Sequence, residues 1–294
     1  MSLPEALNDL FARYGIGNRR TPAPAVAVLR LSGVIGRAGF GRRGLTAAVL
    51  EPLIKRAFSR QVRAVALVIN SPGGSPVQSA QIASLVRFYS QDKKIPVFAF
   101  AEDVAASGGY WLALAGDEVY ADPMSIIGSI GVVSAGFGFQ ELIAKIGVER
   151  RVHTQGERKS MLDPFRPEDP DDVRRLSEIQ AEIHSEFKKF VRARRGERLT
   201  AGDETLFNGD IWAGERALAL GLIDGLGDMR TIMRKKYGSE VRFVNVERPA
   251  GWLERKFGRF LPGASMGSDD VAGGWAGDIL AAVEERALWS RFGL

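Results

Sequence analysis

Three glycine-rich turns follow apolar runs in this sequence, and their residue types are suited to binding an anion. They are the segments 70–75 (NSPGGS), 106–109 (ASGG) and 127–131 (IGSIG). Paired glycines let backbone N–H groups approach a ligand closely, and such groups hold either a phosphate or the oxyanion of acyl transfer. The phosphate-binding patterns GxGxxG and GxxxxGK[ST] are missing at these turns. The remaining interpretation is acyl transfer, which needs a nucleophile, a base and an oxyanion hole.

Ser107 is the candidate nucleophile, because it lies where an apolar run predicted as a strand, 96–101, leads toward a predicted helix. The N-terminus of a helix favours negative charge that develops beside it. A serine at this position is also a common helix N-cap, worth about 1 kcal/mol, and the turn alone favours that simpler role. No charged residue directly adjoins Ser107, so a base has to come from elsewhere in the chain.

The candidate bases are few. The chain has two histidines: His184 lies in a predicted long helix, 171–195, and His153 on a predicted strand, 149–154, with no aspartate placed to orient either one. A lysine base must be neutral, and lowering its pKa from about 10.4 to near 7 costs about 4 to 5 kcal/mol. Lys159 follows the predicted strand directly and precedes two apolar residues, which makes it the best-placed lysine. A solvated loop lysine is still the simpler interpretation of the local sequence.

The elements that would position these residues alternate along the chain. The predicted strands are 25–35, 64–70, 96–101 and 118–121, and the predicted helices between and after them are 45–59, 76–91 and one beginning near residue 107. Buried strand, glycine-rich turn and helix in this order indicate βα units and a mostly parallel sheet. Turns after parallel strands converge on one edge of the sheet, so all three glycine-rich turns are expected to line one site.

Composition limits the function classes. The 294 residues are 45% hydrophobic, enough for a substantial core, and the absence of cysteine excludes disulfides, thiolate catalysis and cysteine zinc sites. No stretch approaches the roughly 20 uncharged apolar residues of a membrane span, and no apolar core of a signal peptide is seen, so we expect a cytoplasmic protein. Residues 13–63 hold eleven Arg and Lys against the single acid Glu51, but no nucleic-acid-binding module accompanies them, and we expect no nucleic-acid partner.

Taken together, these motifs resemble the signal peptide peptidase A family, membrane-associated Ser-Lys serine peptidases related in fold to Clp protease and crotonase enzymes. The resemblance spans about 25–237 and includes AVAVLRLSGVIG, LVINSPGGSPVQSAQIA, AASGGYWLALAGDEVYADPMSIIGSIGV and TQGERKSMLDPFRPED. The base lysine of this family lies in a G-x-x-K motif, which 156–159 (GERK) matches.

The resemblance implies a role for each matching residue. Ser107 would attack the peptide carbonyl, and Lys159 would accept its proton and return it to the leaving amine. Ser129 would hydrogen-bond the lysine and orient it. The implied reaction forms an acyl-enzyme and needs neither a cofactor nor a metal. Three glycines would form the oxyanion hole: Gly73, Gly74 and Gly108.

The same resemblance implies an α/β fold, with Clp/crotonase-like repeated ββα units and a mostly parallel sheet. We expect an N-terminal extension (1–24), a Ser-Lys peptidase domain (25–240) and a C-terminal amphipathic extension (241–294). The implied function is hydrolysis of apolar peptides, such as cleaved signal peptides or fragments of membrane proteins. This chain matches the short, single-domain form, whose relatives assemble into rings or domes. The basic N-terminal region and aromatic tail suggest peripheral association with the inner membrane.

Three alternatives remain open. A Clp-like Ser-His-Asp peptidase needs a histidine soon after the nucleophile, yet the first is His153, 46 residues after Ser107. A crotonase-type acyl-CoA enzyme would use the glycine turns for a thioester oxyanion and Ser107 only as a helix cap, which leaves Lys159 without a role. A non-catalytic scaffold is disfavoured because both dyad residues are present.

Overall fold

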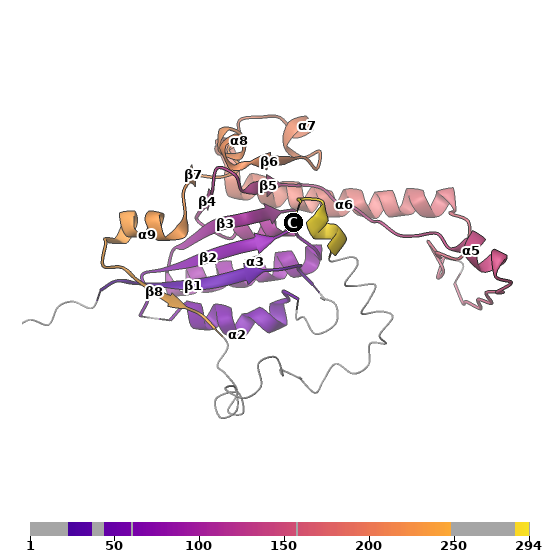
Figure 1. Cartoon of the computed structure of the whole chain (residues 1–294), viewed down its shortest axis with the longest axis horizontal. Helices are drawn as coiled ribbons and strands as arrows, with labels where there is room; N and C mark the ends of the chain where they lie inside the picture. Colours follow the sequence, from indigo (N-terminus) through magenta and orange to yellow (C-terminus); the bar gives the residue numbers. More distant parts are fainter. Residues whose placement is uncertain (1–22, 37–43, 60, 157, 248–285, 294) are drawn as a thin grey trace, which may run out of the picture.

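A computed structural model describes residues 23–36, 44–59, 61–156, 158–247 and 286–293 (Figure 1). The strands are β1 (Ala25–Ser32), β2 (Ala64–Ser71), β3 (Val97–Ala106), β4 (Glu118–Ala121), β5 (Ile126–Gly128), β6 (Ile211–Ala213), β7 (Gly225–Leu226) and β8 (Arg242–Asn245). The helices are α2 (Ala47–Ala57), α3 (Pro76–Lys93), α4 (Gly108–Ala113), α5 (Gln140–Lys145), α6 (Pro170–Arg195), the 3₁₀ turn η1 (Gly196–Arg198), α7 (Asp203–Leu206), α8 (Gly214–Ala219) and α9 (Met229–Tyr237).

The strands form one sheet in the order β6-β5-β3-β2-β1-β8; off this path, β4 pairs with β3, and β7 pairs with β4. Among the pairings of the described residues, β5 with β6 is antiparallel and the others are parallel. The prediction of an α/β fold with a mostly parallel sheet is therefore confirmed. Because β8 pairs with β1, the sheet continues past residue 240, where the predicted peptidase domain ends.

Both faces of the central strands are covered, which explains why they read as continuous apolar runs. Side chains such as Leu29 and Leu67 join the main core beneath α2, α3 and α4. On the opposite face, Val26, Phe98 and their neighbours pack against Met233 of α9. Figure 1 shows α9 beside one end of the sheet, and α2 and α3 along the face that carries the main core.

A segment between β5 and α6 leaves the body of the molecule. We call residues 132–169 the arm; it contains α5 and lies at the N-terminal end of α6, away from the sheet (Figure 1). The predicted strand at 149–154 is wrong, because these residues have no regular structure and nearly all of them are exposed. Only Val152 and Thr154 among them favour a strand, and no described strand pairs with this segment. The long helix predicted at 171–195 is confirmed as α6.

No helix among the described residues combines the length and the apolar character that crossing a bilayer requires. Most of the predicted C-terminal amphipathic extension lies outside the described residues.

Candidate active site

The three glycine-rich turns meet at the carboxyl edge of the sheet, as predicted. The chain after β1 reaches the turn after β2 through a bridge between Ile35 and Gly74. A methyl group on Gly73 would lie 2.8 Å from Ser107 Cβ, so the turns after β2 and β3 are in contact. The Ser107 N–H donates to the Gly128 carbonyl over 2.8 Å, which joins the turn after β3 to the turn after β5. One small region of the edge thus holds all the predicted site residues except Lys159.

Ser107 occupies a strained backbone conformation at the junction of β3 and α4. Its φ of 52° and ψ of −121° lie in a region that residues with side chains rarely adopt, at a cost of about 1 to 3 kcal/mol. Hydrogen bonds on both sides hold the conformation: Ser107 N–H to Gly128, and Trp111 N–H to the Ser107 carbonyl over 3.0 Å. Although Ser107 is at the N-cap position, its side chain makes no capping hydrogen bond within the described chain. The hydroxyl is therefore left for chemistry, and the simple cap interpretation loses its support.

Two amides beside Ser107 are suited to bind an oxyanion. The N–H groups of Gly74 and Gly108 donate to no other backbone group in the part of the chain that is described. A methyl group on Gly108 would be 3.4 Å from the Gly74 nitrogen, so the two amides are neighbours. The Gly73 N–H, by contrast, already donates to Ser71 Oγ over 3.2 Å. Of the three predicted donors, two are available in this geometry.

Ser129 lies directly after the residue that binds the Ser107 amide. It is buried, with 8% of its surface exposed, and its φ of 52° is again unusual for a residue with a side chain. Its N–H donates to the Asp210 carbonyl over 2.7 Å, and its own carbonyl accepts from Gly131 over 3.0 Å. The turn therefore holds a second, nearly enclosed serine close to the first.

Lys159 is not brought to this edge within the isolated chain. It is exposed, and its backbone N–H closes a turn with the Gly156 carbonyl over 3.1 Å. It belongs to the segment between α5 and α6, which Figure 1 shows at the far end of α6 from the sheet. Within the described ranges, no hydrogen bond joins Lys159 to Ser107 or Ser129, and the dyad stays a prediction.

Neither histidine contacts Ser107 through a hydrogen bond among the residues described. His153 lies exposed on the arm. His184 is half-buried on α6, with Nε2 3.2 Å from the Ile130 carbonyl, and so it contacts the turn that carries Ser129. This geometry gives a Ser-His-Asp triad at Ser107 no support.

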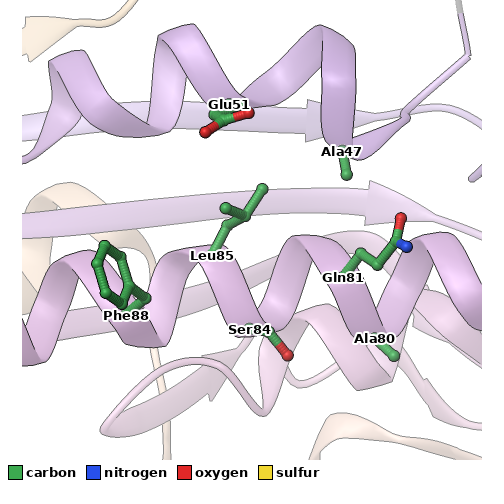
Figure 2. A pocket seen from close by; sticks show the side chains of 7 residues that line it. All are labelled: Ala47, Glu51, Ala80, Gln81, Ser84, Leu85 and Phe88. Atoms are coloured by element: carbon green, nitrogen blue, oxygen red, sulfur yellow. The ribbon is translucent and has the colours of Figure 1, made fainter.

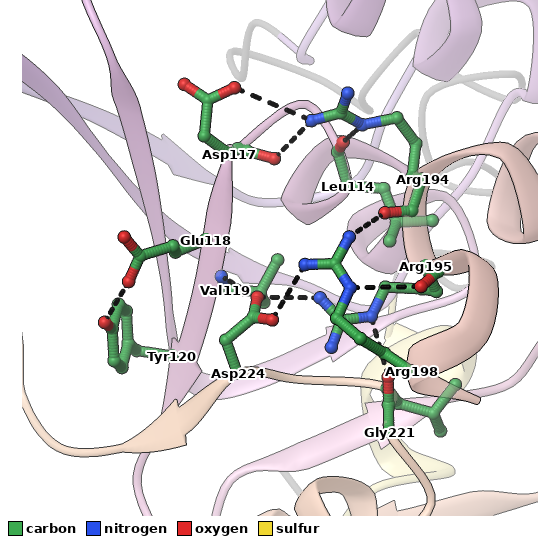
Figure 3. Close-up of polar contacts among 12 residues, drawn as sticks. Leu114, Asp117, Glu118, Val119, Tyr120, Arg194, Arg195, Arg198, Gly221 and Asp224 are labelled. Carbon is green, nitrogen blue, oxygen red and sulfur yellow. Dashed lines mark hydrogen bonds and ion pairs between the residues drawn. The ribbon is translucent and has the colours of Figure 1, made fainter. Parts of the chain in front are cut away.

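The C-terminal half of α6 packs against α4, the helix that follows Ser107. Trp111 of α4 stacks against Phe187 and Phe190, with ring centroids 4.7 and 5.1 Å apart. Near the end of α6, Arg194 Nε donates to the Leu114 carbonyl over 2.7 Å, which satisfies a free acceptor at the end of α4 (Figure 3). The helix that leads into the arm is thus fixed at its other end to the helix that begins after Ser107.

A buried ion pair supports the same junction. Arg195 Nη1 and Arg198 Nη1 donate to the two carboxylate oxygens of Asp224 over 2.7 and 3.0 Å (Figure 3). Burial alone would raise the pKa of Asp224, but hydrogen bonds from Arg195 and from the Val119 N–H outweigh it and lower the pKa. Burial raises the pKa of Tyr110, whose hydroxyl donates to a backbone carbonyl over 2.7 Å. These groups have structural roles beneath α4.

Polar residues that no catalytic motif marked also shape this edge. Ser79 is fully buried, and its hydroxyl donates to the Ser75 carbonyl over 2.9 Å and lies where a methyl group on Gly108 would come within 2.4 Å. Ser71, also fully buried, engages the Gly73 amide. Ser71 lies inside the NSPGG motif, and Ser79 follows that motif by five residues, on the helix predicted at 76–91.

A separate hollow lies between α2 and α3, away from these residues (Figure 2). Its volume is about 530 Å³. None of the predicted site residues lines it, since its walls come from Ala47, Glu51, Ala80, Gln81, Ser84, Leu85 and Phe88.

A family model and several known proteins match this chain. The family model described as Peptidase family S49 matches residues 89–240, about half of the chain. A Brucella abortus protein named Na(+)/H(+) antiporter NhaA is 47% identical over 301 residues, which cover all of this chain and 40% of that protein. The chloroplastic serine protease SPPA of Arabidopsis thaliana is 28% identical, over 76% of this chain and 35% of its own length. The chain therefore spans well under half the length of these curated relatives.

Among solved structures, a membrane-bound stomatin-specific protease in complex with a substrate peptide is similar, with a TM-score of 0.48 and 16% identity. The match covers 78% of this chain and 94% of that one.

Proposed function

Because the chain belongs to peptidase family S49, we propose that it is a serine endopeptidase with Ser107 as the nucleophile and Lys159 as the general base. Both residues lie inside the matched range 89–240. The observation that carries the proposal is the geometry of Ser107, a strained and uncapped serine beside two free amides, Gly74 and Gly108. An uncommitted hydroxyl next to two convergent N–H donors is the arrangement that acyl transfer requires.

In the proposed reaction, Ser107 Oγ attacks the carbonyl carbon of the scissile peptide while its proton passes to Lys159 Nζ. The carbonyl oxygen becomes an oxyanion that accepts hydrogen bonds from the Gly74 and Gly108 amides. Collapse of this intermediate breaks the C–N bond, and Lys159 returns the proton to the departing amine. Lys159 then removes a proton from water, which attacks the ester, releases the carboxylic acid and restores Ser107.

The base must be neutral to accept a proton, and an exposed ammonium is strongly hydrated. Lys159 is exposed in the single chain, so we propose that a second copy supplies the enclosure. The arm supports this view, because it presents large apolar side chains to solvent. They are Val133, Phe137, Leu142, Ile146 and Val148, each more than half exposed.

We therefore propose a closed homo-oligomer, a ring or dome, in which the arm of one copy delivers Lys159 to Ser107 of the next. Placement of the arm at the remote end of α6 supports a contact between copies (Figure 1). Burial of its apolar side chains would contribute about 25 cal/mol for each Å² removed from water. Ser129, beside Ser107, would accept a hydrogen bond from the incoming lysine.

The proposed substrates are extended apolar peptides, such as cleaved signal peptides or fragments of membrane proteins. We further propose a cytoplasmic enzyme that associates peripherally with the inner membrane. The antiporter name belongs to a relative of which this chain spans 40%, and we propose no ion exchange for this chain. The peptidase proposal has the better support, because the S49 match includes the Ser107 turn.

The test measures hydrolysis of an unstructured protein and of an apolar peptide by the purified chain, by Ser107→Ala and by Lys159→Ala. Each substitution should lower kcat by about 10³-fold or more, because nucleophile and base act as a unit. Lys145→Ala, which removes another exposed lysine of the arm, is the control and should retain full activity.

Mixing the two inactive variants tests whether the dyad forms between copies. On random assembly about one site in four joins an intact serine to an intact lysine, so activity should return to about a quarter of the wild-type value. A mixture that stays inactive places both groups in one copy. Full activity of Lys159→Ala alone would overturn the lysine as base, and thioester turnover by Ser107→Ala would favour the crotonase-type alternative.

A further inference from the structure

Strand β3 contains an irregularity five residues before Ser107. Ile69 of β2 pairs with Ala101, but Ser71 pairs with Ala105. Two steps along β2 thus correspond to four steps along β3, so β3 carries two extra residues at this point. Bulges of this kind bend a strand and redirect the side chains that follow.

Asn70 fills the irregularity from the β2 side. Its Oδ1 accepts a hydrogen bond from the Val104 N–H over 3.3 Å, which satisfies an amide that the neighbouring strand no longer reaches. Its Nδ2 donates to Asp103 Oδ2 over 2.7 Å. One side chain therefore holds both a backbone group and a side chain of the extra segment.

Ser125 fills the irregularity from the other side. Its hydroxyl donates to the Glu102 carbonyl over 2.5 Å and lies 3.4 Å from the Ala101 carbonyl. The hydroxyl oxygen in turn accepts a hydrogen bond from the Asp122 N–H over 3.0 Å. Only 2% of the residue is exposed. Since it lies between β4 and β5, its hydroxyl sits at the point where β3 exchanges one neighbour for the other.

The exchange of neighbours fixes the position of the nucleophile. Before the irregularity, β3 pairs with β4, and after it, residues 104–106 pair with β5. Strand β5 ends at Gly128, whose carbonyl binds the Ser107 amide. Removing two residues from the path would move Ser107 by about 6 to 7 Å along the strand, at about 3.3 Å a residue. That displacement would carry it away from Gly74.

From this geometry we infer that Asn70 and Ser125 are positioning residues for the reaction, which hold the extended path of β3 so that Ser107 meets the two free amides. The inference rests on the proposed function. Neither side chain would touch the substrate; each acts through the backbone of residues 102–104.

Peptide hydrolysis and amide hydrogen exchange test this inference together. Asn70→Ala should lower kcat about 10- to 100-fold with KM changed less than about twofold, because a misplaced nucleophile affects the chemical step rather than binding. In the same variant, hydrogen exchange at the Val104 and Ser107 amides should be about tenfold faster or more than in the wild type, because these amides spend less time hydrogen-bonded. Ser125→Ala should change both readouts in the same direction and keeps the test open if Asn70→Ala folds poorly.

Two matched variants serve as controls. Arg30→Ala removes an exposed ion pair to Glu102 beside the irregularity and should leave kcat within about twofold. The double change Asn70→Asp with Asp103→Asn reverses the amide and the carboxylate, keeps an acceptor for Val104, and should restore most of the activity that Asn70→Ala loses.

Unchanged exchange and unchanged kcat in both Asn70→Ala and Ser125→Ala would overturn the inference. If these variants accelerate exchange while the wild-type chain hydrolyses no peptide, the positioning role stands and the proposed peptidase function fails. Failure of the double change to recover activity would show that the shape of Asn70 matters rather than its hydrogen bonds, and would contradict a positioning role that acts through those bonds.

Discussion

The sheet edge and the arm carry the two halves of the proposed dyad, and the fold treats them in opposite ways. Around Ser107, neighbouring residues are buried, backbone groups other than the Gly74 and Gly108 amides are mostly paired, and the serine is held in a strained conformation. Around Lys159, the described residues form turns without a helix or strand, and large apolar side chains elsewhere on the arm, within 133–148, face solvent. The proposed nucleophile is thus fixed within one copy, whereas the environment of the proposed base is incomplete.

This contrast has a chemical rationale. An oxyanion hole depends on donors that do not reorganise during the reaction, so it has to be rigid. A neutral lysine depends on removal from water, which a surface segment can obtain only by contact with another molecule. A peptidase built in this way would be inactive as a single chain and active when assembled, so that unassembled copies would not cleave nearby proteins.

A matched pair of glycines gives the largest expected difference between the two regions. A methyl group on Gly74 would lie 2.1 Å from the Ile35 carbonyl oxygen at a φ of 139°, so Gly74→Ala must displace the turn. Loss of one oxyanion donor lowers kcat by about 10² to 10³. Gly147, on the arm, has a φ of 69° and no atom within 4 Å of the added methyl, so Gly147→Ala should cost only about 1 kcal/mol of backbone strain.

Kinetics of peptide hydrolysis and chemical denaturation of both variants measure this difference. Equal losses of kcat in Gly74→Ala and Gly147→Ala would show that the arm is as constrained as the edge, and would break the comparison.

Aromatic side chains provide a second matched pair, read out by stability. Phe187 is 3% exposed and stacks on Trp111, so Phe187→Ala should lower the free energy of unfolding by about 3 to 5 kcal/mol. Phe137 on the arm is 66% exposed, and the centroid of its ring lies 6.1 Å from that of Phe139. Phe137→Ala should therefore change the free energy of unfolding by less than about 0.5 kcal/mol. Urea denaturation at low protein concentration, where copies are separate, compares the two. A large loss from Phe137→Ala would mean that the arm packs into the fold of the single chain.

Much of the edge could be predicted because the relevant rules are local. Apolar runs and glycine turns indicated the parallel strands, and convergence of their turns follows from that topology alone. The motifs also pointed to Ser107 and to the Gly74 and Gly108 amides. The strand prediction failed at 149–154, where only Val152 and Thr154 favour a strand and no described strand pairs with the segment.

Other features depend on distant pairings that no local pattern encodes. The two extra residues of β3 become visible only when β2, β4 and β5 lie beside it, and the same is true of the roles of Asn70 and Ser125. The G-x-x-K motif indicated Lys159 as the base, but it held no information on where the arm would place it. Its place depends on how copies contact one another, so the dyad stays a prediction until the mixing experiment is done.

A pair of carboxylates gives the smallest expected effect and tests the contrast through pH. Hydrogen bonds from Arg195 and Val119 overcome the effect of burial and lower the pKa of Asp224, and a hydrogen bond from the Phe165 amide lowers the pKa of Asp163 on the arm. A lowered pKa means stabilisation that is complete above the unfolded value of about 3.9 and is lost as the pH falls through the folded value.

Asp224→Asn should therefore lower the free energy of unfolding at pH 7, where it leaves Arg195 buried without its carboxylate, and the difference from wild type should shrink as the pH falls below about 4. Asp163→Asn should lower that free energy by a smaller amount at pH 7, and this difference should also shrink as the pH falls, because the bonds of Asp163 to Arg150 and to the Phe165 amide lie within the arm. Denaturant titrations between pH 7 and pH 3 make the comparison. If Asp163→Asn lowered the free energy of unfolding as much as Asp224→Asn at every pH, the arm would be as firmly part of the fold as the sheet, and the proposed division between a rigid nucleophile and a base completed by assembly would not hold.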